Sequence, residues 1–198
     1  MRREAPTGLS GRAKLTLFHG SGLPADQVLG MTDESISFDV LIKHGIKALN
    51  IGTAGLKPME LHRMGATDAS HLRRLGFDAL HLVDPVFCTE ANAAYGAKAL
   101  LEVFLVSPQD AVSIAGSEAM ATLGVTVEKL LETCAGSPQE AAAVLQQCMG
   151  PACLNGVSAN TLLSTGLRAP QLKTLGFSMQ HVSKCGSRGE ISKLGYTL

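Results

Sequence analysis

Glycine recurs at a ten-residue step along the second half of this 198-residue chain. Ten glycines lie between residues 76 and 186, and eight of them share one register, whose remaining slots keep the spacing without insertion or deletion. The eight are Gly76, Gly96, Gly116, Gly136, Gly156, Gly166, Gly176 and Gly186. Gly45, Gly55 and Gly65 show the same step upstream, and one extra residue before Gly76 shifts the phase. A fixed period of this kind is typical of a repeated supersecondary unit.

The unit is clearest in three consecutive segments, GVSANTLLST, GLRAPQLKTL and GFSMQHVSKC, which together cover residues 156–185. When the glycine is counted as position 1, apolar residues occupy positions 2 and 7 of all three segments. Position 3 is polar and often serine, a residue that caps the first turn of a helix. The next glycine is predicted to end that helix, because glycine adopts the left-handed C′ conformation without strain. Each unit is therefore predicted to be one short helix followed by a turn.

In the middle of the chain the glycines keep the same phase but recur every 20 residues, which predicts pairs of helices there. Ser107-Pro108 and Ser137-Pro138 have serine at the N-cap and proline at the first helical position, and an acid, Asp110 or Glu140, follows at the third, which is a good signature of a helix start. Thr89 and Thr126 are predicted to begin further helices. The expected repeat is thus about 10 residues long, with units paired to about 20.

Short helices of this length are unstable alone, since an isolated helix needs about 12–15 residues even to be marginal in water. They survive by stacking their apolar positions on neighbouring units, and ordered stacking of this kind gives an α-solenoid. The predicted fold is therefore all-α: a flexible basic N-terminal arm over residues 1–21, a helical-repeat solenoid over residues 22–186, and a cap or tail over residues 187–198. An irregular helical bundle whose glycines merely end its helices is the alternative. A β-solenoid is disfavoured because the apolar positions do not alternate.

Composition restricts the class of protein further. Hydrophobic residues make up 45% of the chain and charged residues 17%, which is typical of a globular protein. Seventeen basic residues balance seventeen acidic ones, and the zero net charge weighs against a protein that mainly tracks phosphates. Five cysteines without a secretory signal favour an intracellular, reducing compartment. No apolar run reaches the roughly 20 residues of a membrane span, and the basic residues among 1–18 are compatible with organellar import.

The sequence contains no pattern that points to chemistry. Cys148 and Cys153 lack the second pair of ligands that a zinc site needs, and no nucleophile elbow, paired carboxylates or triad pattern is recognised. We therefore expect no catalytic residue, no cofactor and no metal, and the chain is not expected to be an enzyme. His62, His71 and His81 recur at roughly the repeat spacing, which suggests either a ladder on one face or ordinary surface histidines.

Repeated short helices without chemistry favour a non-catalytic scaffold or adaptor that binds other proteins, as a structural subunit of a larger complex. The alternative is RNA or DNA binding through repeated units. A stretch over residues 172–182 has the spacing of a helix-turn-helix, although the ten-residue period produces the same spacing by itself. The residues that would contact nucleic acid are Arg168, Lys173, Lys184 and Arg188.

A mutation tests the structural reading of the period. If Gly166 and Gly176 occupy the left-handed C′ conformation, replacing either with alanine or valine should lower the free energy of unfolding by roughly 1 kcal/mol or more. The measurement is chemical denaturation of each variant beside the wild type. A neutral result at both positions would show that the period is not structural.

Overall fold

The computed structural model describes residues 8–197, and this part of the chain is all-helical, as predicted. It contains sixteen α-helices and three 3-10 helices, and no strand occurs within these residues. Arg2 and Arg3 of the predicted basic arm lie outside the described residues. The elements of the first half are α1 (Gly11–Leu17), α2 (Ala25–Gly30), η1 (Asp33–Ser35), α3 (Phe38–Lys43), α4 (Ala48–Ala54), α5 (Pro58–Arg63), α6 (Ala69–Arg74), η2 (Ala79–Val83) and α7 (Pro85–Tyr95). Those of the second half are α8 (Ala97–Phe104), α9 (Pro108–Ile114), α10 (Glu118–Leu123), α11 (Val127–Thr133), α12 (Pro138–Gln147), η3 (Pro151–Leu154), α13 (Ala159–Ser164), α14 (Ala169–Thr174), α15 (Met179–Val182) and α16 (Arg188–Lys193).

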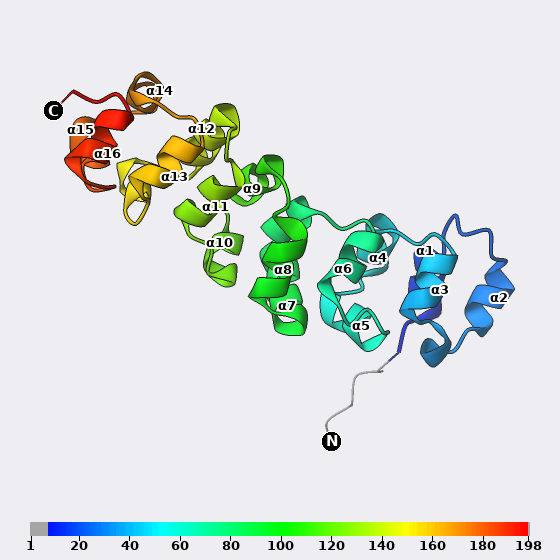
Figure 1. Cartoon of the computed structure of the whole chain (residues 1–198). Helices are drawn as coiled ribbons and strands as arrows, with labels where there is room; N and C mark the ends of the chain where they lie inside the picture. The colour runs from blue at the N-terminus through cyan, green and yellow to red at the C-terminus, as the bar shows by residue number, and fades with distance from the viewer. Residues whose placement is uncertain (1–7, 198) are drawn as a thin grey trace.

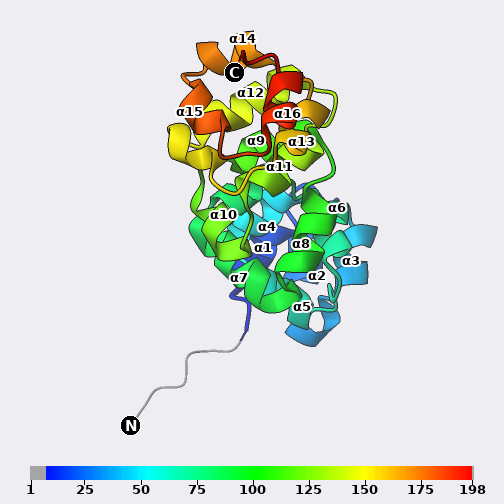
Figure 2. The same cartoon turned by 60° about the vertical axis from the view of Figure 1, so that its left-hand side comes forward.

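The elements follow one another in chain order along an elongated molecule, from α1–α3 at one end to α14–α16 at the other (Figure 1, Figure 2). Many neighbours in space are not consecutive in the chain but lie about three units apart. Such pairs include α5 with α7, α6 with α8, η2 with α9, α9 with α12, α11 with α13, and α13 with α16. Elements that lie three apart in chain order thus pack directly against one another, alongside contacts between consecutive elements such as η2 with α7. The ten-residue period of the sequence does not reveal this larger step.

Position 3 of the unit is the N-cap of the helix. In the last three units the N-caps are Ser158, Arg168 and Ser178, and the helix begins at the following residue. A second polar position, the third residue of the helix, was recognised in the sequence only at Asp110 and Glu140. The third residue of many helices accepts a hydrogen bond from the backbone N–H of the N-cap, as the second half of a capping box does. The residues whose side chains do this are Asn50, Glu60, His71, His81, Asp110, Gln171, His181 and Glu190.

The glycines of the register share an unusual backbone conformation. Ten of the eleven glycines singled out in the sequence have positive φ, with values between 66° and 99°. Gly186 is the exception, so it does not adopt the left-handed conformation expected of a helix stop there. Gly186 directly precedes Ser187, which is the N-cap of α16. Most of the positive-φ glycines come one residue after the C-cap, which is the C′ position where glycine is favoured.

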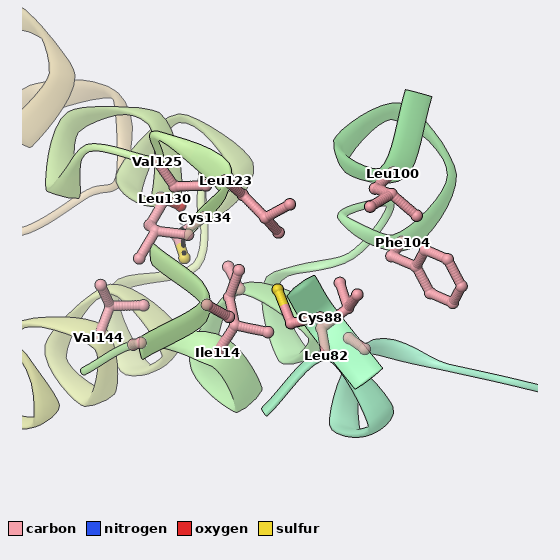
Figure 3. Close-up of a cluster of buried hydrophobic side chains, with 14 of the residues drawn as sticks. Leu82, Cys88, Leu100, Phe104, Ile114, Leu123, Val125, Leu130, Cys134 and Val144 are labelled. Carbon is pink, nitrogen blue, oxygen red and sulfur yellow. Dashed lines mark hydrogen bonds between the residues drawn. The ribbon is translucent and has the colours of Figure 1, made fainter. Parts of the chain in front are cut away.

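The apolar positions form one continuous core that extends from Leu17 to Tyr196. Position 7 is fully buried in the regular units, as Leu162, Leu172 and Val182 illustrate. Position 4 is also mostly buried, usually as alanine, because a small side chain there lets the helix start approach its neighbour. Figure 3 shows the central part of the core, where side chains of η2 and of α7 to α12 lie together.

Backbone hydrogen bonds join the start of one helix to the end of a later one. The first N–H of α3, at Phe38, donates to the carbonyl of Met64 at 2.7 Å, and that of α4, at Ala48, donates to Leu75 at 2.7 Å. The same bond recurs near the C-terminus, where the N–H of Ala169 donates to Leu194 at 2.8 Å. Short helices leave most of their end groups without an internal partner. These bonds satisfy some of those groups and connect units that are not consecutive.

Two expectations from the sequence need correction. Residues 1–21 are not wholly a flexible arm, because α1 packs against α4 and buries Leu17 completely. Thr89 does not begin a helix: α7 starts at Pro85, where the Asp84 carboxylate accepts from the backbone N–H of Phe87 at 2.7 Å. The segment predicted to be a cap or tail contains α16, which packs against α13.

The surroundings of the glycines predict a graded set of mutational effects. Gly176 has open space around it, so Gly176→Ala should cost only the strain of its positive φ, about 1 kcal/mol. At Gly116 a new Cβ would lie 2.6 Å from the backbone oxygen of Gln147, so Gly116→Ala should destabilise by more than about 2 kcal/mol. Gly189, inside α16 with open space and no positive φ, is the control, and Gly189→Ala should be stabilising by up to about 1 kcal/mol. Urea denaturation of the three variants measures these differences, and equal losses at all three would contradict the assignment.

Candidate interaction surfaces

An apolar groove of about 580 Å³ lies between α4, the start of α5, η2 and α7. Its aromatic wall is formed by Phe77 and Phe87, whose rings are stacked with centroids 5.0 Å apart, and by His81, which meets Phe77 edge-on at 5.0 Å. The remaining residues that line the groove are Ala48, Leu49, Gly52, Thr53, Leu56, Lys57, Pro58, Asp84, Val86 and Glu90. Polar groups are confined to a few positions, among them the ion pair of Lys57 and Glu90 at 3.4 Å.

The groove exposes large apolar side chains. Leu49 of α4 is 82% exposed and Val86 of α7 is 59% exposed. Gly52 also lines the groove, and it lies in the body of a helix, where a glycine costs roughly 0.5–1 kcal/mol relative to alanine. A Cβ at Gly52 would meet nothing within 4 Å, so no contact within the described chain requires a glycine there. The absence of a side chain at Gly52 keeps the groove open at α4.

A second hollow of about 450 Å³ continues this surface toward the N-terminal end. It shares Leu49 and Thr53 with the groove and adds Leu15 of α1, which is 39% exposed. Arg12 and His19 lie on its border. The two hollows together form one surface over α1, α4 and α7, and the exposed Leu49 belongs to both.

The histidines do not form one ladder. His71 and His81 occupy the same capping position of successive units, and their Nδ1 atoms accept from the backbone N–H of Asp68 and Asp78. His71 stacks on Phe38 at 4.3 Å, whereas His62 meets Tyr95 edge-on at 5.4 Å. The regular spacing of His71 and His81 therefore follows from helix capping, and His62 belongs to a different environment.

The cysteine thiols lie in environments that disfavour reactive thiolates. Burial raises the pKa of all five cysteines, and that of Cys153 to about 11. A thiol with a raised pKa stays protonated at neutral pH and is a weak nucleophile and a weak metal ligand. Within residues 8–197, no group of three or more His, Cys, Asp or Glu residues is arranged to hold a metal ion.

The four basic residues singled out in the sequence lie in the last helices. Arg168 caps α14 and Lys173 lies near its end; Lys184 lies in the connection between α15 and α16, and Arg188 is the first residue of α16. All four are exposed. The helix-turn-helix spacing over residues 172–182 does not produce a long second helix, because α15 has only four residues.

Glu128 of α11 forms hydrogen bonds to the start of α13, which packs against α11. Its carboxylate accepts from the hydroxyl of Thr161 at 2.9 Å and from the backbone N–H of Ser158 at 3.2 Å, both at the start of α13. These bonds, first that from Thr161 and then those from Ser158, lower the pKa of Glu128 below its ordinary value of 4.5. The carboxylate is thus a structural link between two elements that are distant in the chain.

Comparison of the chain with protein-family models, with curated proteins and with solved structures gives no match in any of the three. Within residues 8–197, no helix combines the length and the apolar character needed to cross a membrane.

The lowered pKa of Glu128 predicts a pH-dependent contribution to stability. A carboxyl whose pKa is lower in the folded state stabilises the fold above its ordinary pKa, and loses this effect as the pH falls through the folded-state pKa. Glu128→Gln should therefore lower the free energy of unfolding by about 1 kcal/mol at pH 7, and by much less at pH 3. Glu132→Gln on the same helix is the control, because Glu132 only pairs with Lys129 on the surface and should have little effect. Urea denaturation at both pH values measures this, and an equal loss at pH 3 and pH 7 would contradict the electrostatic cause.

Proposed function

We propose that this chain is an α-solenoid scaffold that binds a partner protein, and that it works as a structural subunit of a larger assembly. The ten-residue units, the packing of elements about three units apart and the elongated shape support the solenoid part of the proposal. Solenoids offer long continuous surfaces to partners, while their buried positions hold the array together.

The observation that carries the proposal is the apolar groove over α4 and α7. Monomeric proteins seldom expose large apolar side chains together, and such patches mark sites where partners dock. Leu49 and Val86 line this groove beside an aromatic wall of two phenylalanines. Aromatic and aliphatic groups at the centre of a contact commonly supply most of the binding energy. The groove is therefore the proposed docking site for an apolar segment of the partner.

The scaffold is proposed to be non-catalytic. Its groove combines an apolar surface with an ion pair between Lys57 and Glu90, and His81 in it accepts a backbone hydrogen bond from Asp78. These polar groups are engaged with each other or with the ends of helices. The groove thus offers shape and apolar contact, which suits binding.

A charge placed in the groove tests the proposal. The tagged chain is purified from its native cells, and the proteins that co-purify are quantified for the wild type and for Leu49→Arg. We expect a specific partner to be lost from Leu49→Arg. With the purified partner, calorimetry should show an affinity at least tenfold weaker, because a cation would be buried against apolar groups.

Leu29→Arg is the matched control. Leu29 of α2 is 50% exposed and lies outside the groove, so this variant adds the same charge elsewhere. It should keep the partner, and both variants should unfold at nearly the wild-type temperature since both positions are exposed. Equal retention of the partner by Leu49→Arg and the wild type would contradict the proposed site.

A further inference from the structure

We propose that the C-terminal end of the molecule, formed by α14, α15 and α16, binds the phosphate backbone of double-stranded nucleic acid without reading its sequence. This surface is separate from the apolar groove, and it adds a second ligand to the proposed scaffold. The argument rests on the distribution of charge, on the arrangement of the cations and on the burial of the nearby aromatic side chains.

The net charge of zero conceals a strong segregation along the chain. Residues 156–198 contain five Lys or Arg and a single acid, Glu190, whereas residues 75–155 contain nine Asp or Glu and two Lys. Because the elements follow the chain order along an elongated molecule, this segregation is also spatial (Figure 1). The C-terminal end is therefore cationic and the middle is anionic. A local cationic surface attracts phosphates even when the whole chain is neutral.

The cations at this end are available to a ligand. They are the four predicted residues together with Lys193 of α16, and all are exposed. None of them lies within salt-bridge distance of a carboxylate in the described part of the chain. The single acid is engaged internally, since the Glu190 carboxylate accepts from the backbone N–H and the hydroxyl of Ser187, both at 2.7 Å.

The fold brings cations from different units together. The hydrogen bond from Ala169 to Leu194 joins the start of α14 to the end of α16, and Arg168 and Lys193 each immediately precede one of these residues. Lys173 lies 5.5 Å from the centroid of the Tyr196 ring, which holds it beside the segment that follows α16. The cations thus belong to one end of the molecule although they come from separate helices.

The burial of aromatic residues favours a duplex over a single strand. Proteins that bind single strands stack the bases on exposed aromatic rings. Phe177 and Tyr196 are the aromatic residues of segment 156–198, and each is only 3% exposed. The Tyr196 hydroxyl donates to the carbonyl of Phe177 at 2.8 Å. This end therefore presents positive charge without a stacking platform, which matches the outside of a duplex.

The test uses the full-length chain and a fluorescent 25-base-pair DNA duplex. Anisotropy should show binding at 50 mM NaCl that weakens steeply with salt. The triple variant Lys173→Gln, Lys184→Gln and Arg188→Gln should bind at least tenfold more weakly, and the slope of log affinity against log salt should fall by about 2–3. The control variant Lys43→Gln, Lys98→Gln and Lys129→Gln removes the same charge from α3, α8 and α11, and it should bind within twofold of the wild type.

Several results would overturn the proposal: absence of duplex binding by the wild type, equal weakening in both triple variants, or tighter binding of a single-stranded RNA of the same length. Sedimentation velocity at 50 mM NaCl gives a further arm. Salt-sensitive self-association that the first triple variant abolishes, without duplex binding, would assign the cationic end to the anionic middle of a second copy. Circular dichroism melting of both variants ensures that the comparison is made between folded proteins.

Discussion

The end groups of its short helices are the constraint on which this molecule depends. A helix of six or seven residues leaves most of its N–H and carbonyl groups without an internal partner. Here the first N–H of α3, α4 and α14 donates to the carbonyl of Met64, Leu75 and Leu194 respectively, each in a later unit. Capping side chains satisfy further groups at helix starts. No unit has all of its end groups satisfied alone, so each unit is stabilised by the units that pack against it. A partly assembled array would therefore expose both backbone groups and apolar side chains.

This constraint also explains the uneven surface. Positions 4 and 7 must be buried and positions 3 and 6 are engaged in capping, which leaves position 5 and the loops free to vary. Leu49 occupies position 5 of its unit, and its exposure is therefore not imposed by the repeat. Where the same position of a later unit is polar, as at Asn160 and Gln180, the surface is polar as well. The apolar Leu49 in the groove over α4 and α7 thus departs locally from the polar residues found at position 5 of these later units. A site of specific contact with a partner is expected to show such a departure.

Charge varies along the array in a similar way. An acidic middle and a cationic C-terminal end leave the whole chain neutral, and a bulk count conceals both. The two proposed surfaces lie on different parts of the array: α4, η2 and α7 contribute to the groove, and the cations belong to α14–α16 at the C-terminal end (Figure 1). A scaffold that holds a protein at one surface and nucleic acid at another would bring the two together at a separation set by the array.

The ten-residue glycine period was sufficient to predict helices, most of their N-caps and most of their buried positions, because caps, helix ends and the pattern of apolar residues are local features of each unit. Apart from Asp110, it did not predict the acceptors at the third residue of the helices, which can be Asn, Glu, Gln or His and so look variable in a sequence. It also placed α1 in a flexible arm, because the burial of Leu17 depends on α4, which is not adjacent to α1 in the chain. The three-unit step, the groove and the hydrogen bond from Ala169 to Leu194 at the end of α16 were decided only by the tertiary structure. Each depends on which units lie side by side, and a local pattern carries no information about that.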